Sequence, residues 1–115
     1  MAGDESFQVS GTVEEAETGR PLADLIVRAF DRDLLSDDRL GFATTDADGR
    51  FEIRFARSAF SSGLETHPDL YLRIFDREGT TLIHETTDAI RWNASHSERY
   101  RVRIPAKALH VVGTR

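Results

Sequence analysis

The stretch Thr44-Thr45-Asp46-Ala47-Asp48-Gly49-Arg50-Phe51-Glu52-Ile53-Arg54-Phe55 decides the fold class. From residue 51 to residue 55, apolar and charged residues alternate, which is the period of a β-strand with one buried face. The preceding residues 46–49 are typical of a tight turn, because Asp accepts hydrogen bonds from the following backbone and Gly adopts positive φ. We therefore predict a β-hairpin that joins a strand at residues 40–44 to the strand at residues 51–55.

The same alternation extends to both sides of this stretch. It predicts strands at residues 7–13, 25–30, 40–44, 51–55, 70–75, 80–84 and 99–104, and an eighth, short edge strand at residues 109–112. A polar connection at residues 14–21, a single helical turn near residues 56–60 and a turn at residues 76–79 separate some of them. This pattern predicts an all-β fold: a seven- to eight-stranded antiparallel Greek-key sandwich.

Length and composition limit the classes of protein to consider. The chain has 115 residues, a formal net charge of −5 and no cysteine, which indicates one globular domain over residues 1–115 without disulfides. We expect the core at about residues 7–104 and a tail at residues 105–115. No cluster of Lys and Arg dominates a segment, so nucleic acid is not the expected partner.

The sequence carries no recognisable targeting segment. Residues 1–5 lack the positive and apolar regions of a secretory signal peptide, and the longest apolar runs are far shorter than the ~20 residues of a transmembrane helix. We expect no transmembrane segment, and a protein that is cytoplasmic, exported without a classical signal peptide, or carried by a larger assembly.

Four segments in order resemble the transthyretin-like, or carboxypeptidase-regulatory-like, β-sandwich domains. They are residues 9–13 leading into Thr18-Gly19-Arg20-Pro21-Leu22, residues 40–51, Pro68-Asp69-Leu70-Tyr71, and residues 76–82. The resemblance spans about residues 7 to 84 and implies the sandwich fold. It does not confer a function, because one fold hosts many.

The enzyme branch of this superfamily, the 5-hydroxyisourate hydrolases, resembles the chain in length and in residues 45–50. That branch uses a His in the first strand and a C-terminal Tyr-Arg-Gly-Ser tail. Here residues 7–13 contain no His, and the tail reads Val111-Val112-Gly113-Thr114-Arg115. The groups that would position and activate water are therefore missing, and we expect no enzyme activity, with a transthyretin-related hydrolase as a minor alternative.

Intradiol dioxygenases have related sandwiches and hold iron with Tyr and His. The side chains available for such a cluster are Tyr71, Tyr100, His67, His84, His96 and His110. No pair of them has a ligand spacing, so we expect most of these residues to lie on the surface without a metal.

The candidate metal ligands are Asp31, Asp33, Asp37 and Asp38, which follow the second strand. Ca²⁺ takes several oxygen ligands at once, and loops at one end of a sandwich can supply them. Residues 30–41 also resemble the first calcium loop of calcium-dependent phospholipid-binding sandwiches. The alternative is that these carboxylates only form turns and ion pairs, with four arginines available to neutralise them: Arg28, Arg32, Arg39 and Arg50. Asp46 and Asp48 are expected at the opposite end, because the second and third strands are antiparallel if paired.

The candidate binding residues are Trp92 and the stripe Arg99, Arg101 and Arg103. Trp92 is either a core or loop-covering residue or an exposed anchor of a binding surface. The three arginines share one face of the last strand. We expect a binding or structural module that contacts a protein partner, itself or a larger assembly, with no cofactor other than a possible Ca²⁺. The alternative is a calcium-dependent binding module that uses residues 31–38.

Overall fold

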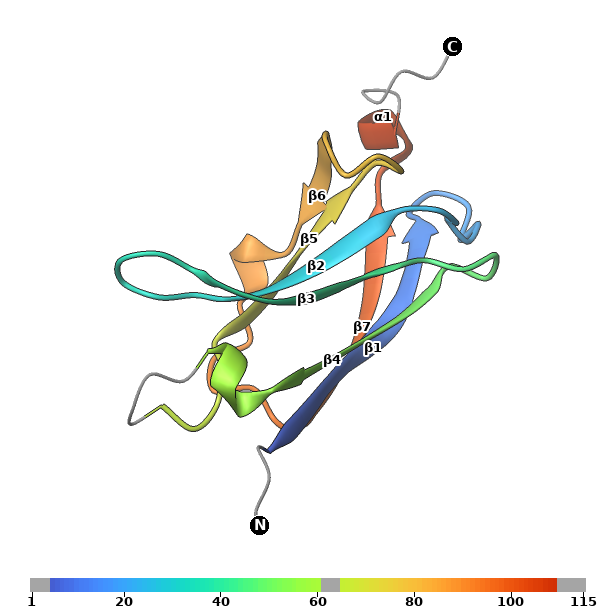
Figure 1. Cartoon of the computed structure of the whole chain (residues 1–115). Helices are drawn as coiled ribbons and strands as arrows, with labels where there is room; N and C mark the ends of the chain where they lie inside the picture. Colours follow the sequence, from blue (N-terminus) through green and yellow to red (C-terminus); the bar gives the residue numbers. More distant parts are fainter. Residues whose placement is uncertain (1–4, 61–64, 110–115) are drawn as a thin grey trace.

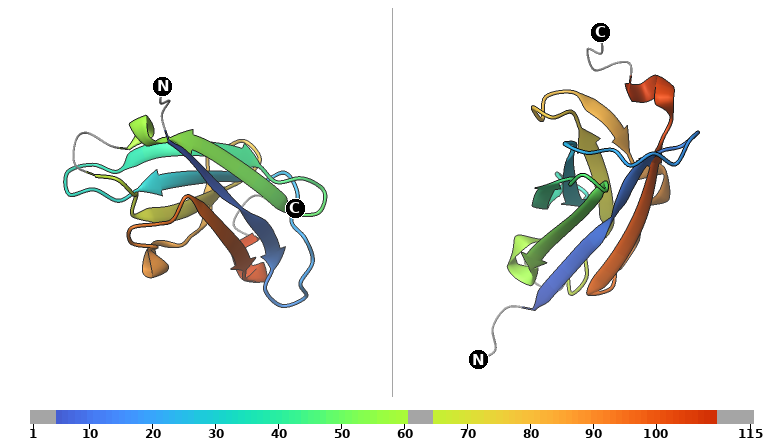
Figure 2. Two further views of the ribbon diagram at one scale, coloured as in Figure 1. Left: turned by 90° about the horizontal axis from the view of Figure 1, so that it is seen from below. Right: turned by 90° about the vertical axis from the view of Figure 1, so that its right-hand side faces the viewer.

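The computed structural model describes residues 5–60 and 65–109, and it is a two-layer β-sandwich (Figures 1 and 2). Within these described residues, seven strands form two sheets. The three-stranded sheet has the order β4 (Arg50–Ala56), β1 (Ser6–Glu15), β7 (Ser97–Ile104). The four-stranded sheet has the order β3 (Asp38–Thr44), β2 (Ile26–Asp31), β5 (Leu70–Phe75), β6 (Leu82–Glu85). The prediction of an all-β sandwich is confirmed.

Three short helical segments connect or follow the strands. They are the 3₁₀ turns η1 (Arg57–Ala59) and η2 (Thr87–Ala89) and the single-turn helix α1 (Ala106–Leu109). The helical turn expected near residues 56–60 is therefore present. Leu109, expected to begin an eighth strand, ends α1 instead, and the rest of that segment lies outside the described residues. Within the described residues, no helix is long and apolar enough to cross a membrane.

The turn at residues 46–49 has the predicted chemistry, but it does not close a hairpin. The Asp46 amide bonds to the Arg50 carbonyl, and the Asp46 carboxylate accepts the Arg50 amide at 2.9 Å. However, β3 pairs with β2 and β4 pairs with β1, so the turn carries the chain from one sheet to the other. Gly49 lies against β1: its carbonyl accepts the Val13 amide at 2.8 Å. This contact directs the chain to β1 instead of back along β3.

The pairing of β1 with β7 is parallel, whereas the other strand pairs of the described residues are antiparallel, as the predicted sandwich requires. The register runs from Gln8 opposite Ser97 to Glu15 opposite Ile104. The chain leaves the four-stranded sheet after β6 and enters β7 at the end where β1 begins, so the two strands run in one direction. Gly11 permits the close approach, since a Cβ there would lie 2.2 Å from the Tyr100 carbonyl oxygen.

The core lies between the two sheets and comes from the predicted alternation. The fully buried apolar side chains of the strands are Phe7, Val9, Val13, Val27, Ala29, Ile53, Leu70, Leu72, Ile74 and Ile104. Burying this apolar surface supplies the main driving force for folding. In β5 the alternation confirms the predicted strand, with Leu70, Leu72 and Ile74 facing the other sheet.

A β-bulge interrupts β3 and changes which of its side chains face the core. Ala29 pairs with Gly41, but Phe30 pairs with Arg39, which leaves Leu40 as the additional residue. Leu40 is buried, whereas Phe42 is 68% exposed on the outer face of the sheet. The period-two reading of residues 40–44 as a regular strand therefore misses the bulge.

Candidate metal centre

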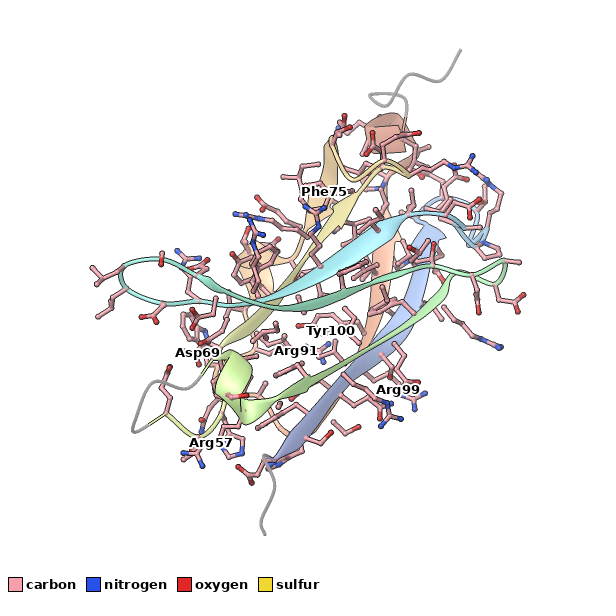
Figure 3. All side chains as sticks on the ribbon, in the orientation of Figure 1. Arg57, Asp69, Phe75, Arg91, Arg99 and Tyr100 are labelled. Carbon is pink, nitrogen blue, oxygen red and sulfur yellow. The ribbon has the colours of Figure 1, made fainter. Side chains whose placement is uncertain are left out.

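Three carboxylates from separate segments meet at one end of the four-stranded sheet. Asp31 is the last residue of β2, Asp69 precedes β5, and Glu65 lies in the connection before it. One oxygen from each of the three carboxylates lies within 4.8 Å of the other two. We call these three residues the acidic site; Figure 3 labels Asp69.

Backbone hydrogen bonds fix two of the three ligand positions. The Asp69 amide donates to Asp31 Oδ1 at 2.7 Å, and the Arg32 amide donates to the Asp69 carbonyl at 2.8 Å. The Asp69 carboxylate in turn accepts the Asn93 amide at 2.8 Å. These hydrogen bonds connect the end of β2 to the start of β5 and to the loop before β7, around the acidic site.

Asp31 is the unusual member of the acidic site. It is completely buried, and its Oδ2 has no hydrogen-bond partner among the described residues. An unpaired buried carboxylate is costly, so this residue calls for a compensating partner. Desolvation raises the pKa of Asp31 to about 7, and the negative charges of Glu65, Asp69 and Asp38 add to this rise, although the Asp69 amide opposes it.

The pKa of Glu65 is raised for the same reasons as that of Asp31. Desolvation raises the pKa of this carboxyl, and the charges of Asp33, Asp69 and Asp38 raise it further. Several carboxylates held together without a cation repel one another, and a divalent cation would reverse that repulsion. With Ca²⁺–oxygen bonds of about 2.3–2.6 Å, two ligands of one ion lie up to about 5 Å apart, so the spacing of the acidic site fits Ca²⁺.

The other predicted ligands have different roles. Asp37 accepts the Tyr71 hydroxyl and, at 3.0 Å, the Asp33 amide, so it closes the loop between β2 and β3. Although partial burial pushes the pKa of Asp37 upward, these bonds and the nearby Arg32 and Arg73 lower it overall. The carboxylate of Asp33 accepts the Leu34 amide at 2.6 Å. Of the four predicted ligands, the three-oxygen group includes only Asp31.

Asp33 and Asp38 nevertheless remain near the acidic site. Asp38 begins β3 directly opposite Asp31, and its charge raises the pKa of both Asp31 and Glu65. The charge of Asp33 acts on Glu65. These two carboxylates therefore add negative potential around the site.

Some of the acidic residues have the alternative role, in which carboxylates only form turns and ion pairs. Asp46 caps its turn, and Asp48 lies 3.9 Å from Arg50. Both residues follow β3 at the end opposite Asp31, as the antiparallel pairing of β2 with β3 requires. Among the described residues, no arginine lies within ion-pair distance of Asp31.

Sequence reasoning missed Glu65 and Asp69. Asp69 was recognisable as the residue before a predicted strand, but its use as a ligand depends on β5 pairing with β2, which places Leu70 opposite Asp31. Glu65 lies in a segment without periodicity, where no pattern predicts which way a side chain faces.

Trp92 and the arginine stripe lie in different environments. Trp92 is 66% exposed in the loop before β7, which matches the exposed alternative. Arg101 and Arg103 both contact Glu14, at 2.8 and 3.3 Å, so their charge is partly neutralised. Arg99, labelled in Figure 3, lies on the outer face of the three-stranded sheet. With Arg50 and Arg101 it lines an open groove of about 910 Å³.

The described Tyr and His side chains do not gather into one cluster. The rings of His67 and His96 lie 5.2 Å apart, but both pack on Phe7. Tyr71 bonds to Asp37, and Tyr100 carries the Arg91 guanidinium on its ring at 3.7 Å. His84 is in β6, and His110 lies outside the described residues.

Comparisons with known proteins support the fold. No family model matches the sequence, and no curated protein matches it. A 9R-lipoxygenase from Cyanothece PCC8801 is similar in structure, with a TM-score of 0.66 and 23% identity over 85% of this chain and 16% of the lipoxygenase. The dioxygenase domain of a dioxygenase–carbohydrate-binding protein fusion from Streptomyces sp. SirexAA-E has a TM-score of 0.53 and 16% identity, over 90% of this chain and 81% of that one.

These two likenesses concern the fold alone. The identities are low, and this chain spans only about a sixth of the lipoxygenase's length. What the two proteins share with this chain is its fold.

Proposed function

We propose that this chain is a non-catalytic binding module whose acidic site binds one Ca²⁺. The observation that carries the proposal is the buried, unpartnered Asp31 Oδ2 beside the carboxylates of Glu65 and Asp69. A hard cation with oxygen ligands satisfies that atom and neutralises the surrounding charge. Backbone carbonyls and water would complete the six to eight ligands that Ca²⁺ takes.

Isothermal titration calorimetry of the whole chain with Ca²⁺ tests the site. We expect one binding event per chain, and a loss of at least about tenfold in affinity in Asp31→Asn and Asp69→Asn, since each removes one charged ligand. Asp48→Asn is the matched control: it removes the same charge from an exposed turn at the opposite end, and we expect it to leave the affinity unchanged.

A titration without heat at millimolar Ca²⁺, together with no thermal shift, would rule out the site. Equal losses in Asp31→Asn and Asp48→Asn would mean that the ion responds to net charge alone. Mg²⁺ is the comparison ion. We expect it to bind more weakly than Ca²⁺, because its shorter bonds and strict octahedral geometry are harder to satisfy with carboxylates from three separate segments.

The same end of the molecule is the proposed contact surface for a protein partner or a second copy of the chain. The loop between β2 and β3 extends beyond the sheets (Figure 1), and its Leu34 and Leu35 are 99% and 97% exposed. Trp92, on the loop tied to Asp69 through Asn93, is exposed at this end too. An exposed Trp is a frequent anchor of protein interfaces, and exposed apolar residues gathered at one place mark interaction sites.

Sedimentation velocity, run in Ca²⁺ and in EDTA, tests the contact surface on the chain alone and on the chain isolated with its native partners. We expect a larger species that Leu34→Ser combined with Leu35→Ser abolishes. Leu82→Ser, which alters an exposed leucine on β6, is the control and should retain that species. A monomer under every condition would contradict this part of the proposal.

Membership of the transthyretin-like group and the hydrolase alternative stay predictions. Turnover of a panel of ureides and esters would favour the hydrolase, and loss of that turnover in His84→Ala would assign it to this chain. The absence of turnover would leave the binding module as the function to pursue.

A further inference from the structure

The outer face of the four-stranded sheet carries a second concentration of charge, distinct from the acidic site. Three arginines and three phenylalanines of β3, β2 and β5 surround a hollow of about 540 Å³ there: Arg28, Phe30, Arg39, Phe42, Arg73 and Phe75. We call these six residues the Arg–Phe face. Its hollow has the size of a small-molecule site.

Strand register explains why these residues meet. Arg28 lies between Phe42 on β3 and Arg73 on β5, and one pair further along the sheet Phe30 lies opposite Arg39. The bulge at Leu40 allows Arg39 and Phe42 to flank the hollow from one strand, although they are three residues apart. The backbone at Ala29 and Gly41 forms part of its lining.

Two of the three guanidinium groups, those of Arg28 and Arg73, are held in place before any ligand arrives. Arg28 stacks on the Phe75 ring at 4.5 Å, and Arg73 lies 5.2 Å from the Phe30 ring and donates to Glu85 at 3.0 Å. Figure 3 labels Phe75 on this sheet. Planar guanidiniums fixed by stacking lose little freedom when they bind a carboxylate, which favours binding.

The charge of the face is only partly compensated by neighbouring carboxylates. In the described part of the chain, Arg73 forms an ion pair with Glu85, whereas Arg28 and Arg39 have no carboxylate within ion-pair distance. Beside them, Phe42 exposes 68% of its surface to solvent. Two unpaired guanidiniums next to an exposed ring are complementary to a ligand that combines a carboxylate with an apolar body.

From this juxtaposition we propose that the Arg–Phe face is a binding site for a carboxylate attached to an apolar group. The carboxylate pairs with Arg28 and Arg39, and the apolar group packs on Phe42. The chemistry is shared by a free aryl or alkyl carboxylic acid and by an acidic residue next to an aromatic one in a peptide. This site requires no metal, so its test is independent of whether the acidic site binds Ca²⁺.

Two-dimensional NMR titration in EDTA tests the site with phenylacetate as the probe. We expect saturable shifts at the backbone amides of β2, β3 and β5, and affinity at least tenfold higher than for acetate or for 2-phenylethanol, which each supply half of the ligand. Arg28→Gln and Phe42→Ser should each weaken binding of phenylacetate by at least about tenfold.

Arg54→Gln is the matched control, because it removes one exposed arginine of β4 from the other sheet, and it should bind phenylacetate as the wild type does. Melting temperatures within a few degrees of the wild type establish that each variant is folded. Equal binding of acetate, equal binding of 2-phenylethanol, or an equal loss in Arg54→Gln would overturn the site.

A capped peptide that contains Asp-Phe in a Gly-Ser background distinguishes the two sources of the ligand. Binding of the peptide with shifts at the same amides, with or without binding of phenylacetate, supports a protein segment as the natural ligand. Binding of phenylacetate alone supports a free acid. Failure of both probes to shift the amides of β2 and β3 rejects the proposal.

Discussion

At the scale of single residues, Thr45 shows how one buried hydroxyl holds a corner of the sandwich. Its Oγ1 donates to the Leu22 carbonyl at 2.7 Å and accepts the Leu25 amide at 3.0 Å, and the residue is buried. Thr45→Val fills the same space but leaves both backbone groups unpaired, which we expect to lower the free energy of unfolding by about 1–3 kcal/mol.

Urea unfolding of Thr45→Val and Thr45→Ser checks this assignment. Thr45→Ser keeps the hydroxyl and loses only a methyl group, so it should cost clearly less than Thr45→Val. If Thr45→Ser is the more costly variant, methyl packing and not hydrogen bonding is the source of the stability.

Asp31 gives the molecule a pH dependence whose sign is opposite to that of a salt-bridged carboxylate. The pKa of Asp31 in the folded protein is about 7, above its ordinary value of 3.8. Between these pH values the folded chain holds a proton that the unfolded chain has lost. The contribution of Asp31 to the stability of metal-free protein is therefore complete below pH 4 and falls as the pH rises toward 7, by a few kcal/mol at most, at about 1.4 kcal/mol per pKa unit.

Comparing wild type with Asp31→Asn in EDTA isolates this contribution, because the asparagine does not titrate. We expect the variant to gain stability relative to wild type between pH 4 and pH 8, and to lose that advantage when Ca²⁺ is added at pH 8. A difference between the two proteins that is constant across this range would contradict the raised pKa.

At the scale of elements, Gly19 and Gly49 allow the cost of a strained backbone conformation to be distinguished from the cost of a steric clash. Gly19 and Gly49 both have positive φ, at 77° and 74°. A Cβ at Gly19 meets nothing within 4 Å, whereas a Cβ at Gly49 would lie 2.5 Å from the Val13 carbonyl oxygen. We expect Gly19→Ala to cost about 1–2 kcal/mol from the left-handed conformation alone, and Gly49→Ala to cost at least about 1 kcal/mol more.

Thermal and urea unfolding of the two variants measures that difference. Equal losses would mean that the turn before β4 moves away from β1 at little cost. In that case the contact between Gly49 and Val13 would not be what directs the chain from one sheet to the other.

The turn at residues 46–49 also shows what the sequence can predict about an element. Asp46 and Gly49 predict a turn, and alternation predicts the strand that follows, because both depend on local chemistry. Which strand pairs with which depends on contacts distant in sequence, such as Gly49 with Val13. The predicted hairpin was wrong for this reason, and local pattern likewise does not predict the parallel pairing of β1 with β7.

The acidic site follows the same rule. Asp31 was predicted as a ligand from the local run of Asp residues after β2. Glu65 and Asp69 reach it only through the pairing of β5 with β2, over a separation of more than thirty residues. Local pattern therefore identified one of the three residues of the acidic site, and topology supplied the other two.

At the scale of the whole molecule, the four-stranded sheet separates charge in a chain of net charge −5. Carboxylates gather at the end where β2 stops and β5 starts, and unpaired arginines lie on the outer face of the same sheet. Asp31 and Phe30 are neighbours in β2, so the acidic site and the Arg–Phe face share one strand. The ligands proposed for them differ: Ca²⁺ for the acidic site and a carboxylate for the Arg–Phe face.

This arrangement predicts how Ca²⁺ acts on global stability. The acidic site joins the end of β2 to the segment before β5, and both strands belong to the core, so unfolding destroys the site. An ion that binds only the folded chain raises the free energy of unfolding by about 1.4 kcal/mol for each tenfold increase in its concentration above the dissociation constant. Chemical denaturation at a series of Ca²⁺ concentrations and constant ionic strength measures this slope.

The slope distinguishes a specific site from general screening of negative charge. Wild type and Asp48→Asn should show the full increase, and Asp31→Asn should show little, although all three carry several exposed carboxylates. NaCl at matched ionic strength should not reproduce the increase, because screening acts on every surface charge and has no saturating site. An equal rise in Asp31→Asn would place the stabilising ion elsewhere on the molecule.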